Sequence, residues 1–126
     1  MPFETPYSLS LNDAVARAMS AGVVVVVPAG NSATDACGYS PASAPTAITV
    51  GSTTVEDEPS TFTNVGWCVD IYAPGSSIVS ASHTSDSGTA TMSGTAMASS
   101  HVAGAVAVLL GRFPTLTPAQ VTTTLQ

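Results

Sequence analysis

Basic residues are almost absent from this sequence. Its 126 residues include two arginines, Arg17 and Arg112, no lysine and eight acidic residues, so the formal net charge is −6. A protein that follows a nucleic-acid backbone needs a cluster of positive side chains, and two arginines cannot provide one. We therefore expect no nucleic-acid partner.

Long apolar runs are also missing. No segment reaches the roughly eighteen uninterrupted apolar residues of a membrane helix, so we expect no membrane partner. The first residues, MPFETPYSLSL, lack the basic and apolar regions of a secretory signal peptide. If the parent protein is exported, we expect its signal to lie elsewhere. Only 8% of the residues are charged and 44% are hydrophobic, which indicates a large buried interior within one domain.

Cysteine is scarce as well, with Cys37 and Cys68 alone. Together with His83 and His101 they show none of the close spacings of zinc ligands. The two thiols are either unrelated buried groups or a disulfide. A disulfide would contribute about 3–4 kcal/mol and imply an oxidising compartment. The residue pattern alone leaves both open.

The first half of the chain has the pattern of a helix followed by a buried strand. Ser10 has the features of an N-cap, apolar residues then recur at helical spacing, and Gly22 is a natural end. Residues 23–27 are five valines, a run typical of a central parallel strand covered on both faces. The loop PAGN that follows lies at the carboxyl end of this strand, where open α/β sheets bind ligands.

The second half continues the alternation of strands and helices. We expect strands at 46–50 and 69–72, a hairpin at 77–81 and 89–93, and a helix over 95–111. The small residues of that helix favour close burial. Thr117, Pro118 and Gln120 form the N-terminal signature of a last helix. The order of the elements predicts the α/β class.

Three stretches together resemble one known family: VVVVVPAGN, then YSPASAPTAITVGST with WCVDIYAPGSSI, then SGTAMASSHVAGAVAVLL. They are similar to the subtilisin-like serine proteases, peptidase family S8, in the proteinase K-like branch. The resemblance covers about residues 10–126 and leaves residues 1–9 unmatched. It implies a parallel-sheet, three-layer α/β fold, present as the C-terminal half of a peptidase domain that spans residues 1–126.

The same resemblance places Ala96 where the family has its nucleophilic serine. Such enzymes cleave peptide bonds through an acyl-enzyme, with a serine, a histidine base and an orienting aspartate. Alanine has no oxygen to activate. The nearby hydroxyls belong to Ser93, Ser99 and Ser100, and we expect them to serve packing or capping.

The family supplies its aspartate in an Asp-Thr/Ser-Gly motif and its histidine in a His-Gly-Thr motif, and neither motif occurs in these 126 residues. We expect His83 to be a solvated turn residue and His101 to be a buried, hydrogen-bonded structural residue. The chain is therefore predicted to be catalytically inactive, and its chemistry would require no cofactor.

Part of the family's electrostatic machinery is retained. By resemblance, Asn31 is the oxyanion-hole asparagine, and the backbone N–H of Ala96 is the second donor. Pro28, Ala29 and Gly30 would line one wall of the pocket for the side chain before the cleaved bond. The family's opposite wall is a Ser-Leu-Gly-Gly-like strand, where this chain has MPFETPYS. We therefore expect an incomplete pocket.

Two further features are implied by the resemblance. Some proteinase K-like enzymes have a disulfide where Cys37 and Cys68 lie, which favours pairing. The carbonyls of Pro45 and Ala47 with the Asp70 carboxylate match a calcium site of the branch. Calcium takes such oxygen ligands, although a solvated aspartate remains the alternative.

Three interpretations of function remain. The first is a serine endopeptidase lineage whose parent is secreted and cleaves peptides or proteins. The second is a pseudoprotease that binds peptides or inhibits. The third is a truncated fragment without a function of its own. The missing N-terminal half and a self-dimer are the expected protein partners, because a half-domain leaves apolar sheet edges uncovered.

Overall fold

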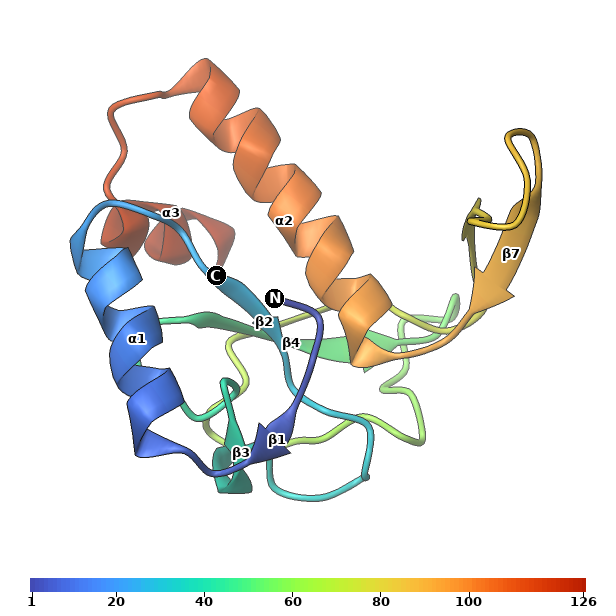
Figure 1. Cartoon of the computed structure of the whole chain (residues 1–126), viewed down its shortest axis with the longest axis horizontal. Coiled ribbons are helices and arrows are strands. Elements are labelled where there is room, and N and C mark those ends of the chain that lie inside the picture. The colour runs from blue at the N-terminus through green and yellow to red at the C-terminus, as the bar shows by residue number, and fades with distance from the viewer.

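The computed structural model describes residues 1–126 as a three-layer α/β unit (Figure 1). The strands are β1 (Thr5–Pro6), β2 (Val26–Pro28), β3 (Tyr39–Ser40), β4 (Ile48–Thr53), β5 (Ile71–Pro74), β6 (Ile78–Ala81) and β7 (Thr89–Met92). The helices are α1 (Leu9–Ser20), α2 (Thr95–Arg112), α3 (Pro118–Leu125) and the short 3₁₀ helix η1 (Ala36–Gly38). No helix is both long and apolar enough to cross a lipid bilayer.

The central sheet has the order β2-β4-β5, and both pairings are parallel. Val26 pairs with Ile48, and Val50 pairs with Ile71. The predicted α/β class and parallel sheet are confirmed. Two antiparallel pairs, β1-β3 and β6-β7, lie outside this sheet, and the second is the hairpin expected from the sequence.

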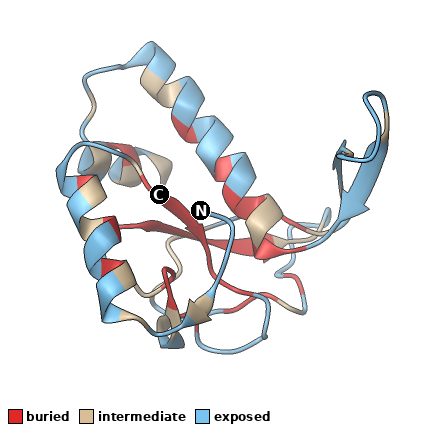
Figure 2. Cartoon of the chain, viewed as in Figure 1, coloured by how far each residue is buried: buried red, intermediate tan, exposed pale blue.

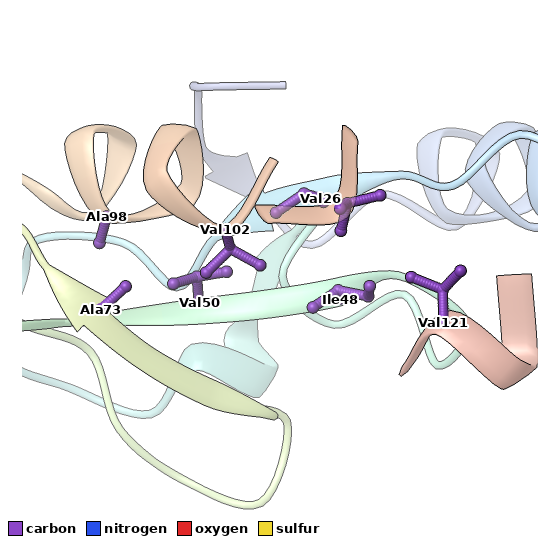
Figure 3. Packing of buried hydrophobic residues seen from close by; sticks show 8 residues of the cluster. Val26, Ile48, Val50, Ala73, Ala98, Val102 and Val121 are labelled. Carbon is purple, nitrogen blue, oxygen red and sulfur yellow. The ribbon is translucent and has the colours of Figure 1, made fainter. Parts of the chain in front are cut away.

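Alternating side chains of the sheet belong to two separate hydrophobic cores, one on each face. One face packs against α2 and α3, and Figure 3 shows Val102 of α2 with Val50, and Val121 of α3 with Ile48. The opposite face packs Val27 of β2 against Val15 of α1. Because successive strand residues point to opposite faces, this arrangement produces the three layers.

The long valine run forms a shorter strand than predicted. The prediction of a strand over residues 23–27 is wrong at its start, since β2 begins at Val26. The reason is local: the N–H of Val23 donates to the Ala18 carbonyl at 3.0 Å, and that of Val25 to the Met19 sulfur at 3.1 Å. The first valines therefore complete the end of α1, and Val23 remains 56% exposed.

The other boundaries shift by a few residues. The N-cap of α1 is Ser8 instead of Ser10, because the Ser8 hydroxyl accepts the Leu11 N–H. The strand expected at 46–50 is β4, which continues through Gly51 to Thr53. A Cβ at Gly51 would collide with the Tyr72 ring of β5, so glycine is required in the middle of this strand.

Helix α2 is covered by this chain on one face only. Ala98, Val102 and Val106 are buried against the sheet, whereas much of the opposite side faces solvent (Figure 2). The exposed residues on that side include Ala103, Gly104, Ala105, Ala107 and Val108. The expected close burial of the small residues is therefore wrong for all of them except Ala98, since no element of the chain lies over them.

Candidate functional site

The Asn31 loop starts at the carboxyl end of β2, as the sequence predicts. Gly30 has a φ of +105°, a conformation that side chains rarely adopt. A Cβ on Gly30 would also collide with the Glu4 carboxylate and the Asn64 amide. Both observations require glycine at this position, and they fix the direction in which the chain leaves the sheet toward Asn31.

Asn64 holds this loop from beneath. Its side chain is 0% exposed, and its Oδ1 accepts the N–H groups of Ser32 at 2.9 Å and Thr34 at 3.1 Å. Its Nδ2 donates to the Ala29 carbonyl at 2.9 Å. The loop is thus fixed on both sides of Asn31 by one buried amide, which replaces the missing backbone partners.

Thr95, at the start of α2, sets the orientation of the Asn31 amide. Its backbone N–H donates to Asn31 Oδ1 at 2.8 Å, and its hydroxyl donates to the same oxygen at 3.0 Å. A backbone N–H can only donate, so the atom that it meets must be the amide oxygen. The Asn31 NH₂ group is therefore left available as a donor.

Ala96 provides a second donor from the first turn of α2. Its N–H has no hydrogen-bond partner within the chain, as is usual for the first N–H groups of a helix. The positive end of the helix dipole adds to the field there. Asn31 and Ala96 both line a cavity of about 40 Å³. Two such donors can hold a carbonyl oxygen that gains negative charge.

The serine hydroxyl groups near Ala96 are all engaged with the backbone. Ser99 and Ser100 donate to the Ala96 carbonyl at 2.9 and 3.0 Å. Ser93 Oγ accepts the Ser77 N–H at 2.8 Å. These contacts are those of packing and capping groups, and none of them prepares an oxygen for attack on a carbonyl.

The two histidines lie apart from each other and from any acidic partner. His83 is exposed in the loop between β6 and β7. His101 Nδ1 lies 3.0 Å from the Met97 carbonyl, but the side chain is exposed. The expectation that His101 is buried is therefore wrong, because its face of α2 is uncovered in this chain.

Residues from two segments line the pocket beside Ala96. Pro28 and Gly30 come from the end of β2 and its loop, and Pro2, Phe3 and Glu4 come from the segment that matched no family motif. The Ala29 side chain is 0% exposed and packs with Ala36 and Ala42 beneath the loop.

Cys37 and Cys68 form a disulfide, with their Cα atoms 5.5 Å apart. It joins η1, which follows the Asn31 loop, to the segment that leads into β5. The pairing suggested by the resemblance is present, and the reading of two unrelated thiols is excluded.

The residues of the expected calcium site face one cavity of about 650 Å³. The carbonyls of Pro45 and Ala47 accept no hydrogen bond within the chain. Burial raises the pKa of the Asp70 carboxyl, and hydrogen bonds from Thr49 and Gln126 partly oppose this. These three oxygen donors fit a weak calcium site, in which water would have to supply most of the ligands.

Replacing Thr95 by valine is expected to lower the free energy of unfolding by about 1–3 kcal/mol, because a buried N–H loses its acceptor. That donor is the Gly30 N–H, which lies 3.1 Å from Thr95 Oγ1. Thr95→Ser keeps the hydroxyl and is the matched control. Urea unfolding of both variants measures the effect. A loss in Thr95→Ser with none in Thr95→Val would show that the methyl group, and not the hydrogen bonds, matters.

Comparison with known proteins identifies the lineage. A family model described as the subtilase family matches residues 3–126 of the chain, including residues 3–9, which the sequence motifs left unmatched. The chain belongs to the subtilase family. Its fold superimposes on a cold adapted subtilisin-like serine proteinase with a TM-score of 0.94 and 48% identity, over 98% of this chain and 44% of that one.

Several subtilases of known sequence are similar to this chain. It is 53% identical to an extracellular serine proteinase of Thermus sp. (strain Rt41A), over 94% of this chain and 29% of that protein. It is 50% identical to alkaline serine exoprotease A of Vibrio alginolyticus, over 90% of this chain and 21% of that protein. It is 48% identical to proprotein convertase subtilisin/kexin type 9 of Rattus norvegicus, over 95% of this chain and 18% of that protein. The chain thus spans less than a third of the length of these relatives.

Three residues of this subtilase site were not predicted from the sequence. Thr95 and Asn64 position the Asn31 loop, but each is more than thirty residues from Asn31, and no local pattern connects them. Glu4 lies in a segment that matched no motif. The one local signal was the Gly-Thr step before Ala96, which marks a helix start and brings the threonine hydroxyl to the loop.

Proposed function

We propose that this subtilase chain binds the carbonyl end of a peptide and does not hydrolyse peptide bonds. The observation that carries the proposal is the donor pair at the start of α2. Thr95 holds the Asn31 oxygen, so that the Asn31 NH₂ group and the Ala96 N–H are both free beside one cavity. The same position has a methyl group where an acyl-enzyme would need an oxygen.

The proposal of inactivity is supported by three separate deficits. Ala96 cannot form an ester with a substrate. The neighbouring serines donate to the backbone, and neither histidine is placed to act as their base. Removal of the triad in subtilisin, a member of this family, leaves a rate about 10³–10⁴ times that of the uncatalysed reaction in water. This remaining enhancement comes from binding and the oxyanion hole. A chain that retains only part of that machinery would fall at or below this level.

A second candidate role is that of one part of a larger subtilase unit. The observation that favours it is the uncovered side of α2, where five small or apolar residues face solvent next to the open edge of β2. We propose that a further part of a subtilase domain covers this side, with a second copy of the chain as the alternative. Light scattering of the chain with and without a preceding segment from a relative distinguishes the two.

We further propose that the parent protein acts outside the cell and has a protein or peptide substrate. The Thermus relative is described as extracellular and as a proteinase. The disulfide supports this, because such bonds persist in oxidising compartments.

Peptide binding without hydrolysis is tested with the product-like peptide N-acetyl-Ala-Ala-Ala-norleucine, whose carboxylate takes the place of the carbonyl oxygen. We expect saturable binding by calorimetry, and a loss of about tenfold in affinity for Asn31→Leu, which removes the donor but keeps the shape. The corresponding peptide amide extended by two residues should remain uncleaved. Binding that is unaffected by Asn31→Leu, or cleavage of the extended peptide, would contradict the proposal.

Calcium is proposed as a structural ion held by Asp70 with the carbonyls of Pro45 and Ala47. Calcium at about ten to a hundred times its dissociation constant should stabilise the fold by about 1–3 kcal/mol. Asp70→Asn should abolish the effect, because it removes the one charged ligand. Thermal unfolding in calcium and in chelator, with Asp57→Asn as a control at an exposed carboxylate, measures this. Equal stabilisation of the Asp70 variant and the original chain would exclude the site.

A further inference from the structure

Glu4 brings a negative charge to the cavity beside Ala96. Its carboxylate lies directly over the Cα of Gly30, since a Cβ there would collide with Glu4 Oε2. Gly30 and Glu4 line the same cavity as Asn31 and Ala96. A peptide whose carbonyl oxygen reached the Asn31 and Ala96 donors would therefore place its adjacent side chain next to this carboxylate.

No cationic group of the chain forms an ion pair with this carboxylate, and the Met1 ammonium group donates instead to the Val26 carbonyl at 2.8 Å. The chain has two arginines and no lysine, and neither arginine lines the cavity. The polar group that faces the carboxylate across Gly30 is the neutral amide of Asn64, whose Nδ2 already donates to the Ala29 carbonyl at 2.9 Å. A cation from outside the chain would supply the missing opposite charge.

The size and walls of the cavity favour an ammonium group. Its volume is about 40 Å³. A water molecule, which is similar in size to an ammonium group, needs about 10–15 Å³ of such cavity space, so the cavity is large enough for an ammonium head. Phe3 and Pro28, which both line the cavity, are apolar and would contact a methylene stem. Lysine combines such a stem with an ammonium head, and it buries the first while its charge finds a partner.

We propose that Glu4 makes this cavity a subsite for a lysine side chain, at the residue whose carbonyl group meets Asn31 and Ala96. The inference rests on the proposed peptide-binding function and adds to it the chemistry of the side chain that is selected. Glu4 acts here as a specificity-determining residue. It is exposed and lies before the first strand, so its replacement leaves the core intact.

The test compares two peptides that differ by one charged group, N-acetyl-Ala-Ala-Ala-lysine and N-acetyl-Ala-Ala-Ala-norleucine, on the 126-residue chain. We expect the lysine peptide to bind about fivefold more tightly, the upper end for a solvent-accessible ion pair. Glu4→Gln should remove the preference, and high salt should reduce it. Glu58→Gln is the matched control, since it removes the same charge from an exposed loop outside the cavity.

The outcomes separate this inference from the function on which it rests. Equal affinities for the two peptides, with Asn31 still required, would overturn the lysine subsite and leave peptide binding in place. A lysine preference that persists in Glu4→Gln, or disappears equally in Glu58→Gln, would overturn the role of Glu4. Failure of both peptides to bind would overturn the peptide-binding function and the subsite together.

Discussion

Ala96→Ser alone is expected to leave this chain without peptidase activity. The substitution restores an oxygen at the start of α2, but no histidine is held toward it by an acidic partner. His83 is in the β6–β7 loop, and His101, which lines a cavity together with Ala96, has its Nδ1 3.0 Å from the Met97 carbonyl. A serine hydroxyl without a base is a weak nucleophile at neutral pH. Hydrolysis of a chromogenic peptide ester, read against buffer alone, measures the outcome.

The same substitution should have a very large effect once the missing groups are supplied. Joining residues 1–126 to a preceding segment that carries the family's Asp-Thr/Ser-Gly and His-Gly-Thr motifs would add the missing aspartate and histidine. In that chimera Ala96→Ser should raise turnover by about 10⁶-fold, the size of the loss measured when the serine of subtilisin, a family member, is removed. Hydrolysis by the isolated Ala96→Ser chain, or an active chimera that still has Ala96, would contradict the account.

Loss of the disulfide should have the largest effect on stability. Cys37 and Cys68 are 31 residues apart, and a cross-link that closes a loop of this length stabilises the fold by about 3–4 kcal/mol in the chain-entropy model. The double variant Cys37→Ala, Cys68→Ala should lose this amount in the free energy of unfolding, measured with urea under oxidising conditions.

The control for this prediction is reduction of the unsubstituted chain with dithiothreitol. The reduced chain keeps both sulfur atoms, so its loss reports the cross-link, whereas the double variant also removes packing of Cys68 against the cluster of Ala29, Ala36 and Ala42. Reduction and substitution should therefore agree to within about 1 kcal/mol. A loss of less than about 1 kcal/mol on reduction would show that the cross-link does not stabilise the fold.

Much of the fold could be predicted from local patterns. The capping residues Thr117 and Gln120 form the capping box of α3 as predicted, since such hydrogen bonds involve neighbours in sequence. Boundaries were less predictable where tertiary contacts compete with the pattern. The valine run predicts five strand residues, but the end of α1 takes the N–H groups of Val23 and Val25.

Burial on α2 could not be derived from the chain alone. The pattern of small residues is suited to close packing on several sides of α2, but only one side of the helix is packed in the structure. His101 is exposed for the same reason, since burial depends on what covers a helix and not only on its own residues. The proposed cover by a further part of a subtilase domain would account for this face.

The two donor residues of the candidate site could be predicted from the sequence, but the residues that hold them in place could not. Asn31 and Ala96 followed from the family motifs, and the structure brings them to one cavity. The hydroxyl of Thr95 and the buried amide of Asn64 depend on long-range hydrogen bonds that no short motif encodes. Phe3 and Glu4 lie in a segment that matched no family motif, so the motifs did not predict that they line this cavity.

The central claim is that Asn31 and Ala96 form a prepared donor pair that binds without reacting. The most direct measurement is a titration of the ¹⁵N-labelled chain with N-acetyl-Ala-Ala-Ala-lysine, followed by nuclear magnetic resonance. We predict that the Asn31 side-chain NH₂ and the Ala96 backbone N–H shift together with one dissociation constant, and that the peptide is recovered unchanged. Shifts confined to other parts of the chain, or none at these two groups at saturation, would contradict the account.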